Sequence, residues 1–260
     1  MALFLGIDVG SVATKGVLLE SGGIRCQHVV PSGYNYGAAA ERARGELIEK
    51  AGVAPHDIAA AATTGSGGGN ARFPSLKASE IVCCARGIEA TFPSARTVIS
   101  IGGQSSQVIR IGKDGRVADF VVSERCAAGS ARFLQVMANV LRVKLEDIGE
   151  LSLKATDPVA FSTGCAVFGE TEAITRISEG FSKEDILAGV HMSLSNKIAS
   201  LVAKVNCVED CAVCGGGGLD IGLVKHLEDK LGLKLLVPPN PQVVTALGAA
   251  AVARESVEGA

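Results

Sequence analysis

Two stretches decide the fold: Phe4-Leu-Gly-Ile-Asp-Val-Gly-Ser-Val-Ala-Thr-Lys-Gly-Val-Leu-Leu19 and Arg96-Thr-Val-Ile-Ser-Ile-Gly-Gly-Gln-Ser-Ser-Gln-Val-Ile-Arg-Ile111. They align without a gap, so that Gly10 falls on Gly102. Each has the pattern of a buried strand, a tight glycine turn and a second apolar strand. A repeat of this length predicts a duplicated α/β fold in which two similar halves face one another.

The segments around the two repeats alternate between strand and helix patterns, with the division at Pro93-Ser-Ala95. We expect a first half over 1–93, a second half over 94–241, and a C-terminal helix over about 242–260 that packs back on the first half. In the first half the patterns predict strands at 3–9, 14–20, 24–30 and 58–63 and helices at 37–52 and 78–91. In the second half, beyond the repeat, they predict helices at 129–142, 166–179, 184–205, about 219–231 and 242–254, and strands at 211–214 and 233–237.

The composition excludes several classes of partner. The chain has 260 residues, a formal net charge of −2 and 47% hydrophobic residues, which is enough for a substantial core. Without a basic excess, neither nucleic acid nor a membrane surface is an expected partner. No run of about 18 apolar residues and no signal-peptide pattern is present, so we expect a cytoplasmic protein. In a reducing compartment its eight cysteines are thiols or metal ligands.

Three glycine-rich loops predict a nucleotide site. The turns at Gly10 and Gly102 point backbone N–H groups outward, and the loop from Gly215 stands between a strand and a helix. One such turn alone is more often an ordinary hairpin, but two facing turns form a clamp for phosphates. Asp8 would hold a water of a Mg²⁺ shell. The expected nucleotide contacts are Gly10, Ser11, Thr14, Lys15, Gly102, Gly103, Gln104, Gly215, Gly216 and Gly217, and the candidate catalytic residues are Asp8 and Gln104.

Two cysteines each precede a predicted helix. Cys126 lies in Glu-Arg-Cys-Ala-Ala-Gly-Ser, and Cys165 lies in Ser-Thr-Gly-Cys-Ala-Val-Phe. A helix N-terminus stabilises a thiolate through its dipole and its free N–H groups. The same donors can bond the sulfides of an Fe–S cluster. The alternative is a pair of small buried cysteines at tight turns.

With these cysteine segments, the chain resembles the activators of 2-hydroxyacyl-CoA dehydratases. The ATPase subunits of benzoyl-CoA reductase and the reductases of double-cubane cluster proteins belong to the same group. The resemblance spans residues 3 to 253. The segments that carry it are Leu5-Gly-Ile-Asp-Val-Gly-Ser11, Ile101-Gly-Gly-Gln104, Cys126-Ala-Ala-Gly-Ser-Ala-Arg-Phe-Leu134, Cys165-Ala-Val-Phe-Gly-Glu170 and Ala246-Leu-Gly-Ala-Ala250.

The resemblance implies a duplicated ribonuclease-H-like fold, that of acetate and sugar kinases, heat-shock 70 and actin, with a nucleotide cleft between the halves. It also implies a homodimer, or a heterodimer with a related subunit, that shares one [4Fe–4S] cluster. In this chain the ligands would be Cys126 and Cys165. ATP binding and hydrolysis to ADP with Mg²⁺ would rotate the halves. An electron would then pass from ferredoxin or flavodoxin to an Fe–S dehydratase or reductase.

One segment departs from the family pattern. The family has Asp-Ile-Gly-Gly-Gln-Asp where this chain has Ser100-Ile-Gly-Gly-Gln-Ser105, so two carboxylates are missing. The hydrolysis of ATP, rather than its binding, is therefore in question. Glu170 or Glu172 is a candidate to face the cleft in place of the missing carboxylates. Two other functions stay open: a sugar- or acetate-type kinase on the same fold, and a nucleotide-regulated subunit that does not hydrolyse ATP. The first would need a catalytic acid and no paired cysteines.

The remaining reactive residues predict no second site. Cys211-Ala-Val-Cys214 has metal-ligand spacing but lies in a predicted buried strand, which favours core thiols. Adjacent helical residues such as Cys83 and Cys84 point in different directions, and they are expected to be thiols too. The four histidines form no cluster in the sequence, and no Ser/His/Asp arrangement is evident.

Overall fold

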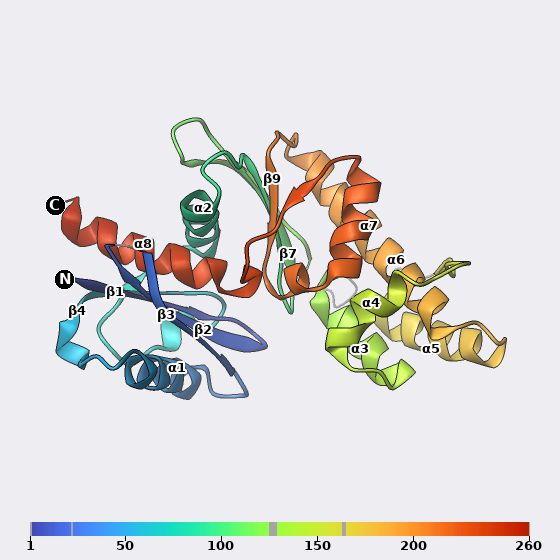
Figure 1. Cartoon of the computed structure of the whole chain (residues 1–260), viewed down its shortest axis with the longest axis horizontal. Coiled ribbons are helices and arrows are strands. Elements are labelled where there is room, and N and C mark those ends of the chain that lie inside the picture. The colour runs from blue at the N-terminus through green and yellow to red at the C-terminus, as the bar shows by residue number, and fades with distance from the viewer. Residues whose placement is uncertain (1, 22, 125–128, 163–164, 260) are drawn as a thin grey trace.

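The structure is a computed structural model that describes residues 2–21, 23–124, 129–162 and 165–259. It contains two five-stranded sheets with helices between and around them (Figure 1). The first sheet has the order β3-β2-β1-β4-β5. Its strands are β1 (Leu3–Val9), β2 (Ala13–Glu20), β3 (Gly23–Pro31), β4 (Ile58–Thr64) and β5 (Leu76–Lys77).

The second sheet repeats the first. Its order is β10-β9-β6-β7-β8, which is the same arrangement read from the other edge. The two antiparallel hairpins share one register, because Val9 pairs with Thr14 on β1 and β2 while Ile101 pairs with Ser106 on β6 and β7. The predicted duplication is confirmed. The strands are β6 (Thr97–Ile101), β7 (Ser106–Ile111), β8 (Val117–Val122), β9 (Cys211–Cys214) and β10 (Leu235–Leu236).

Two helices, α2 (Glu80–Thr91) and α8 (Val244–Glu258), fill the space between the sheets. α8 packs on β1 and β4 of the first sheet, and α2 packs on the second sheet. The other face of the first sheet is covered by α1 (Tyr36–Ala51), as Figure 1 shows. The layers therefore place the N-terminus of α2 near the ends of both central strands, β1 and β6.

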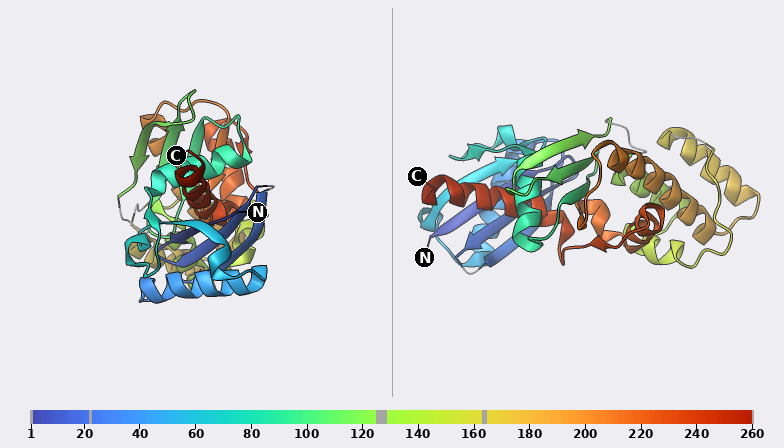
Figure 2. Two further views of the ribbon diagram at one scale, coloured as in Figure 1. Left: turned by 90° about the vertical axis from the view of Figure 1, so that its left-hand side faces the viewer. Right: turned by 90° about the horizontal axis from the view of Figure 1, so that it is seen from above.

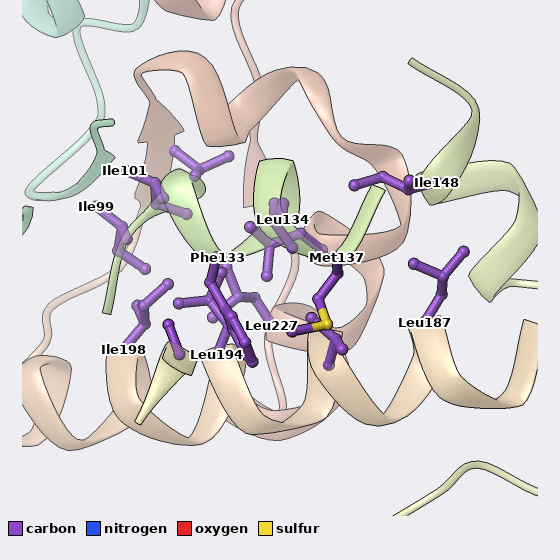
Figure 3. Close-up of a cluster of buried hydrophobic side chains, with 14 of the residues drawn as sticks. Ile99, Ile101, Phe133, Leu134, Met137, Ile148, Leu187, Leu194, Ile198 and Leu227 are labelled. Atoms are coloured by element: carbon purple, nitrogen blue, oxygen red, sulfur yellow. The ribbon is translucent and has the colours of Figure 1, made fainter. Parts of the chain in front are cut away.

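A group of helices lies at the far end from both termini (Figure 2). It includes the two helices predicted to follow Cys126 and Cys165, which we call the cysteine helices. Phe133 and Met137 lie in its core with Leu194 and Leu227 (Figure 3). The long helix α6 is apolar enough to cross a membrane by length and composition, yet 56% of that window is buried inside the protein. The helices are α3 (Ala131–Leu141), α4 (Ile148–Ser152), α5 (Ala166–Ser178), α6 (Lys183–Lys204) and α7 (Ile221–Leu231).

The predicted elements are present with ends that shift by a few residues. The strand expected at 14–20 is β2, and the helix expected at 184–205 is α6. Two short elements, β5 and α4, were not predicted because two to five residues are too few to show a period.

Candidate functional site

The two glycine hairpins line one cleft, with the loop that follows β9 beside them. The turns are built alike, because the Gly10 N–H donates to the Ala13 carbonyl at 3.1 Å and the Gly102 N–H donates to the Ser105 carbonyl at 3.0 Å. Their tips face one another so closely that a Cβ on Gly103 would overlap the Val12 side chain. The cleft is therefore clamped from both halves, as the repeat predicts.

Most of the predicted nucleotide contacts and both candidate catalytic residues line this cleft. They are Asp8, Gly10, Ser11, Lys15, Gly102, Gly103, Gln104, Gly215 and Gly216. Gly215 has a φ of 83°, which only glycine adopts readily, and this turn directs the loop into the cleft.

Two predicted contacts lie elsewhere. Thr14 is buried, and its hydroxyl lies 2.8 Å from that of Ser32, which in turn donates to the Gly10 carbonyl. Gly217 is buried against Ile101. Both support the shape of a loop and are not among the residues that line the cleft. The loop from Gly65 also reaches the site, since Ser66 lines the cleft and the Gly65 backbone lies against Asp8.

The charges of the two hairpins differ. Asp8 stands opposite Lys15, and the Lys15 ammonium donates to the Asp8 carboxylate at 2.9 Å. At the equivalent positions of the second half, Ser100 stands opposite Gln107. Both of these side chains are neutral and buried. The clamp thus has an ion pair on one side and uncharged groups on the other.

A further carboxylate, Glu80 at the start of α2, lines the cleft. Its Oε1 accepts a hydrogen bond from the Gln107 amide at 2.7 Å. Burial and the nearby Asp8 charge raise the pKa of Glu80, while Lys15 and the Gln107 bond act in the opposite direction. Sequence reasoning did not find this residue. The available signal was an acidic residue in the first turn of the helix that crosses between the two halves.

The carboxylates expected to replace the missing ones do not face the cleft. Glu172, on α5, accepts hydrogen bonds from the backbone N–H and hydroxyl of Ser162. Glu170 is an exposed residue of the same helix. Neither is among the residues that line the cleft, so the expectation for both was wrong. They lie on the helix of Cys165, at the far end of the second half.

The opposite wall of the cleft suits an organic ring. Arg132 and Gln135 of α3 line it, and the Arg132 guanidinium donates to the Gln135 side chain at 2.7 Å. Leu145 and Leu219, at 47% and 54% exposure, present apolar surface to the same space. Ligand pockets commonly combine such apolar walls with a few fixed polar groups.

Cys165 caps the N-terminus of α5, as predicted. The nearby backbone N–H groups of Phe168 and Val167 lower the pKa of the thiol, and the Lys197 charge adds to this effect. A half-buried thiolate with such donors has the chemistry of an Fe–S ligand. Cys126 lies outside the described residues. Within the described residues, no group of three or more His, Cys, Asp or Glu is placed to hold a metal ion.

The cysteines of β9 and α2 are buried, as expected for core thiols. Cys211 and Cys214 lie in β9, and the Cys214 sulfur is 3.4 Å from that of Cys84 on α2. Cys83 is fully buried too, and burial raises its pKa to about 11. Thiols with such high pKa values are poor metal ligands and nucleophiles.

The structure contains one Ser/His/Asp arrangement that was not evident in the sequence. His191 lies with Nδ1 2.8 Å from the Ser152 hydroxyl and Nε2 2.9 Å from the Asp220 carboxylate. The three residues are distant in sequence, so only the packing of α4, α6 and α7 brings them together. His191 has no exposed surface, which leaves a substrate no access. The set joins three helices and caps α7, where the Leu223 N–H donates to Asp220 at 3.0 Å.

The second hairpin is joined directly to the start of α3. The Ala131 N–H donates to the Gly102 carbonyl at 2.9 Å, and the Ser106 hydroxyl donates to the Gly129 carbonyl at 2.7 Å. α3 packs in turn on α5, where a Cβ on Gly169 would press on the Phe133 ring. A continuous set of contacts therefore runs from the cleft to the helix of Cys165.

Comparison with known proteins supports the fold and identifies the family. The chain is 39% identical to the (R)-2-hydroxyglutaryl-CoA dehydratase activating ATPase of Acidaminococcus fermentans, over 95% of each chain. It is 33% identical to a benzoyl-CoA reductase subunit of Thauera aromatica, over 96% of this chain and 92% of the relative. The solved activator of the 2-hydroxyisocaproyl-CoA dehydratase from Clostridium difficile, with bound ADPNP, has a TM-score of 0.94 at 35% identity, covering 99% and 98% of the two chains.

A more distant likeness shows the fold alone. A ROK family glucokinase from Streptomyces griseus has a TM-score of 0.61 at 13% identity, covering 97% of this chain and 99% of that one. The predicted duplicated fold of sugar kinases, heat-shock 70 and actin is confirmed. The model of the BadF/BadG/BcrA/BcrD ATPase family matches residues 5–253. The chain therefore belongs to the BadF/BadG/BcrA/BcrD ATPase family.

Proposed function

We propose that the chain is an ATP-dependent activator that transfers low-potential electrons. Two chains would share one [4Fe–4S] cluster, held by Cys126 and Cys165 of each. The cluster would supply a single electron at low potential. MgATP would bind in the cleft between the hairpins, with Asp8 holding a water of the Mg²⁺ shell and Gln104 facing the γ-phosphate.

The observation that carries this proposal is the link between the hairpin and the cysteine helices. A change at Gly102 would move Ala131 through their hydrogen bond, and α3 would transmit the movement to α5. A nucleotide can bias two arrangements only through its different affinity for each. The γ-phosphate is the group that would make this difference, because it would lie where the two hairpin tips meet.

The exposed face of α5 supports a dimer. Val167 and Phe168, directly after Cys165, are 71% and 67% exposed, and Ile174 and Ile177 continue the apolar surface along the helix. Apolar stripes at this spacing are typical of helices that pack on a partner. We propose that the partner is a second copy of this chain or a related subunit, so that the two Cys165 helices meet at the cluster.

Electrons would come from ferredoxin or flavodoxin and pass to an Fe–S dehydratase or reductase in the cytoplasm. The relatives that are named as activators of CoA-ester dehydratases, and the relative named as part of a benzoyl-CoA reductase, support this class of acceptor.

ATP is expected to expose the cluster. In the anaerobically purified, reduced chain, ferrous iron should be removed by bathophenanthroline disulfonate severalfold faster with MgATP than with MgADP, because rotation of the halves opens the cluster surface. Lys15→Met should keep its iron and lose this difference, since Lys15 lines the phosphate end of the cleft. Equal rates with both nucleotides in the parent chain would contradict the proposed coupling.

A second candidate is a nucleotide-regulated subunit that does not hydrolyse ATP. The neutral Ser100 and Gln107 favour it, because the second hairpin has no carboxylate at these positions to hold Mg²⁺ or water. A sugar kinase is supported by the general fold alone. Anaerobic measurement of phosphate release from ATP separates the activator from the subunit that does not hydrolyse it.

Ser100→Asp tests what the missing charge does. Alone, this substitution should lower the free energy of unfolding by about 3 kcal/mol. The reason is that it buries a second carboxylate near Glu80 and provides no cation to pair with it. Adding Gln107→Lys should restore most of this loss, since the pair copies Asp8 and Lys15 of the first half. Thermal unfolding of the two single variants and the double variant measures the coupling. Additive effects would show that residues 100 and 107 do not interact.

A further inference from the structure

Glu80 stands at the point where the two halves of the cleft meet. It lines the same space as Asp8 of the first hairpin and Ser100 of the second. α2 places it there because this helix begins at Glu80 and packs on both β6 and α8. A ligand held by both hairpin tips would therefore extend its terminal phosphate toward this carboxylate.

The hydrogen bond to Gln107 replaces the interaction that the fold symmetry would predict. In the first half the residue on the second strand, Lys15, pairs with the carboxylate directly opposite it, Asp8. In the second half the equivalent residue, Gln107, faces Ser100 on β6 in place of a carboxylate. Its amide instead donates to Glu80 at 2.7 Å. Through Gln107, the second hairpin thus holds the carboxylate of Glu80, which belongs to α2.

The two carboxylates of the cleft differ in their partners. Asp8 is neutralised by the Lys15 ammonium, whereas Glu80 is held by a neutral amide. The titratable groups around Glu80 are Asp8 on β1, Lys15 on β2, and the thiols of Cys83 and Cys84 on α2. Burial and Asp8 raise the pKa of Glu80, so it is more basic than an ordinary glutamate. A carboxylate of raised basicity beside an ion-paired one is the usual arrangement of a general base.

We propose that Glu80 is the catalytic base of ATP hydrolysis in this chain and that Gln107 is its positioning residue. Glu80 takes a proton from a water molecule while the water oxygen bonds to the γ-phosphorus. The bond from that phosphorus to the β–γ bridging oxygen breaks, and its electron pair leaves with ADP. The proton then passes from Glu80 to solvent or phosphate. This inference rests on the proposed function, in which the cleft binds MgATP.

Glu80→Gln should lower kcat for phosphate release at least about 100-fold, the lower end of the usual range for general base catalysis. Binding of ATP and the iron content should stay at the parent level. The assay uses the full chain, purified without oxygen, with MgATP as substrate. Failure of the parent chain to bind ATP would refute the proposed function itself. A parent chain that binds ATP without hydrolysing it, or a Glu80→Gln variant that hydrolyses it normally, would overturn the assignment of Glu80.

Gln107 is tested by the pH profile of kcat. Hydrolysis needs ionised Glu80, so activity falls as the pH drops through its pKa. Gln107→Leu removes a donor that favours the ionised form of Glu80. It should therefore move the acidic limb of the pH profile, the fall in kcat at low pH, to higher pH. Gln107→Lys adds a cation and should move the limb to lower pH. Gln27→Leu on β3, outside the residues that line the cleft, is the matched control and should leave the limb in place. The role of Gln107 would be overturned if the acidic limb did not move in either variant, or if it moved in the same direction in Gln107→Leu and Gln107→Lys.

Discussion

Replacing Cys165 with alanine is expected to remove essentially all iron from the protein while nucleotide binding persists. Cys165 is the N-cap residue of α5, and nearby backbone N–H groups lower the pKa of its thiol and so favour the thiolate, which is the form that binds iron. In a shared cluster one substitution removes a ligand from each chain, so two of the four ligands are lost. Cys165 is not among the residues that line the cleft, so the ATP affinity should not change. Iron analysis and visible absorption of the anaerobic protein measure the first effect, and ATP titration measures the second.

The matched control is Cys26→Ala. Cys26 is also a half-buried free thiol, but it lies on β3 in the first half, away from the cysteine helices. This variant should keep its full iron content. If Cys165→Ala retained half or more of the iron, Cys165 would not be an essential ligand of the cluster, and the proposed site would be refuted.

Features that depend only on residues close together in the sequence, such as the two hairpins and the position of Cys165 before a helix, could be predicted from local patterns. The hairpins at Gly10 and Gly102 follow from the alternation of apolar strand and glycine turn, and each is closed by a hydrogen bond across four residues. The cap at Cys165 follows from its position directly before a helical pattern. The meeting of the hairpins in one cleft could be predicted because a duplicated unit tends to face its copy.

Contacts between distant segments could not be predicted in this way. Glu80 reaches the cleft only because α2 is held between the two sheets, and Gln107 reaches Glu80 from the second sheet. His191 meets Ser152 and Asp220 through the packing of three helices. Polar side chains in such places are set by the tertiary arrangement, and no local period of the sequence indicates them.

The position of Glu80 in the cleft depends on the packing of α2 against α8. α2 carries Glu80 at its first turn and touches α8 along its length. At their crossing, glycine is present on both helices, Gly87 on α2 and Gly248 on α8. A Cβ on Gly248 would overlap the Cys83 carbonyl, and a Cβ on Gly87 would overlap the Val244 carbonyl. The backbones are thus in direct contact, and this contact sets the distance between the halves.

Gly248→Ala is therefore expected to destabilise the protein although alanine is the better helix former. Alanine gains about 1 kcal/mol over glycine in a helix interior. The added methyl group must push α8 away from α2. Overpacking of this kind typically costs about 1–3 kcal/mol and occasionally more. Gly45→Ala, at an exposed position of α1 with open space at its Cβ, isolates the helix gain and should raise Tm. Thermal unfolding compares the two variants, and phosphate release reports whether Glu80 has moved. A Gly248→Ala variant that gained stability as Gly45→Ala does would contradict the close approach of the two helices and, with it, the placement of Glu80 by α2.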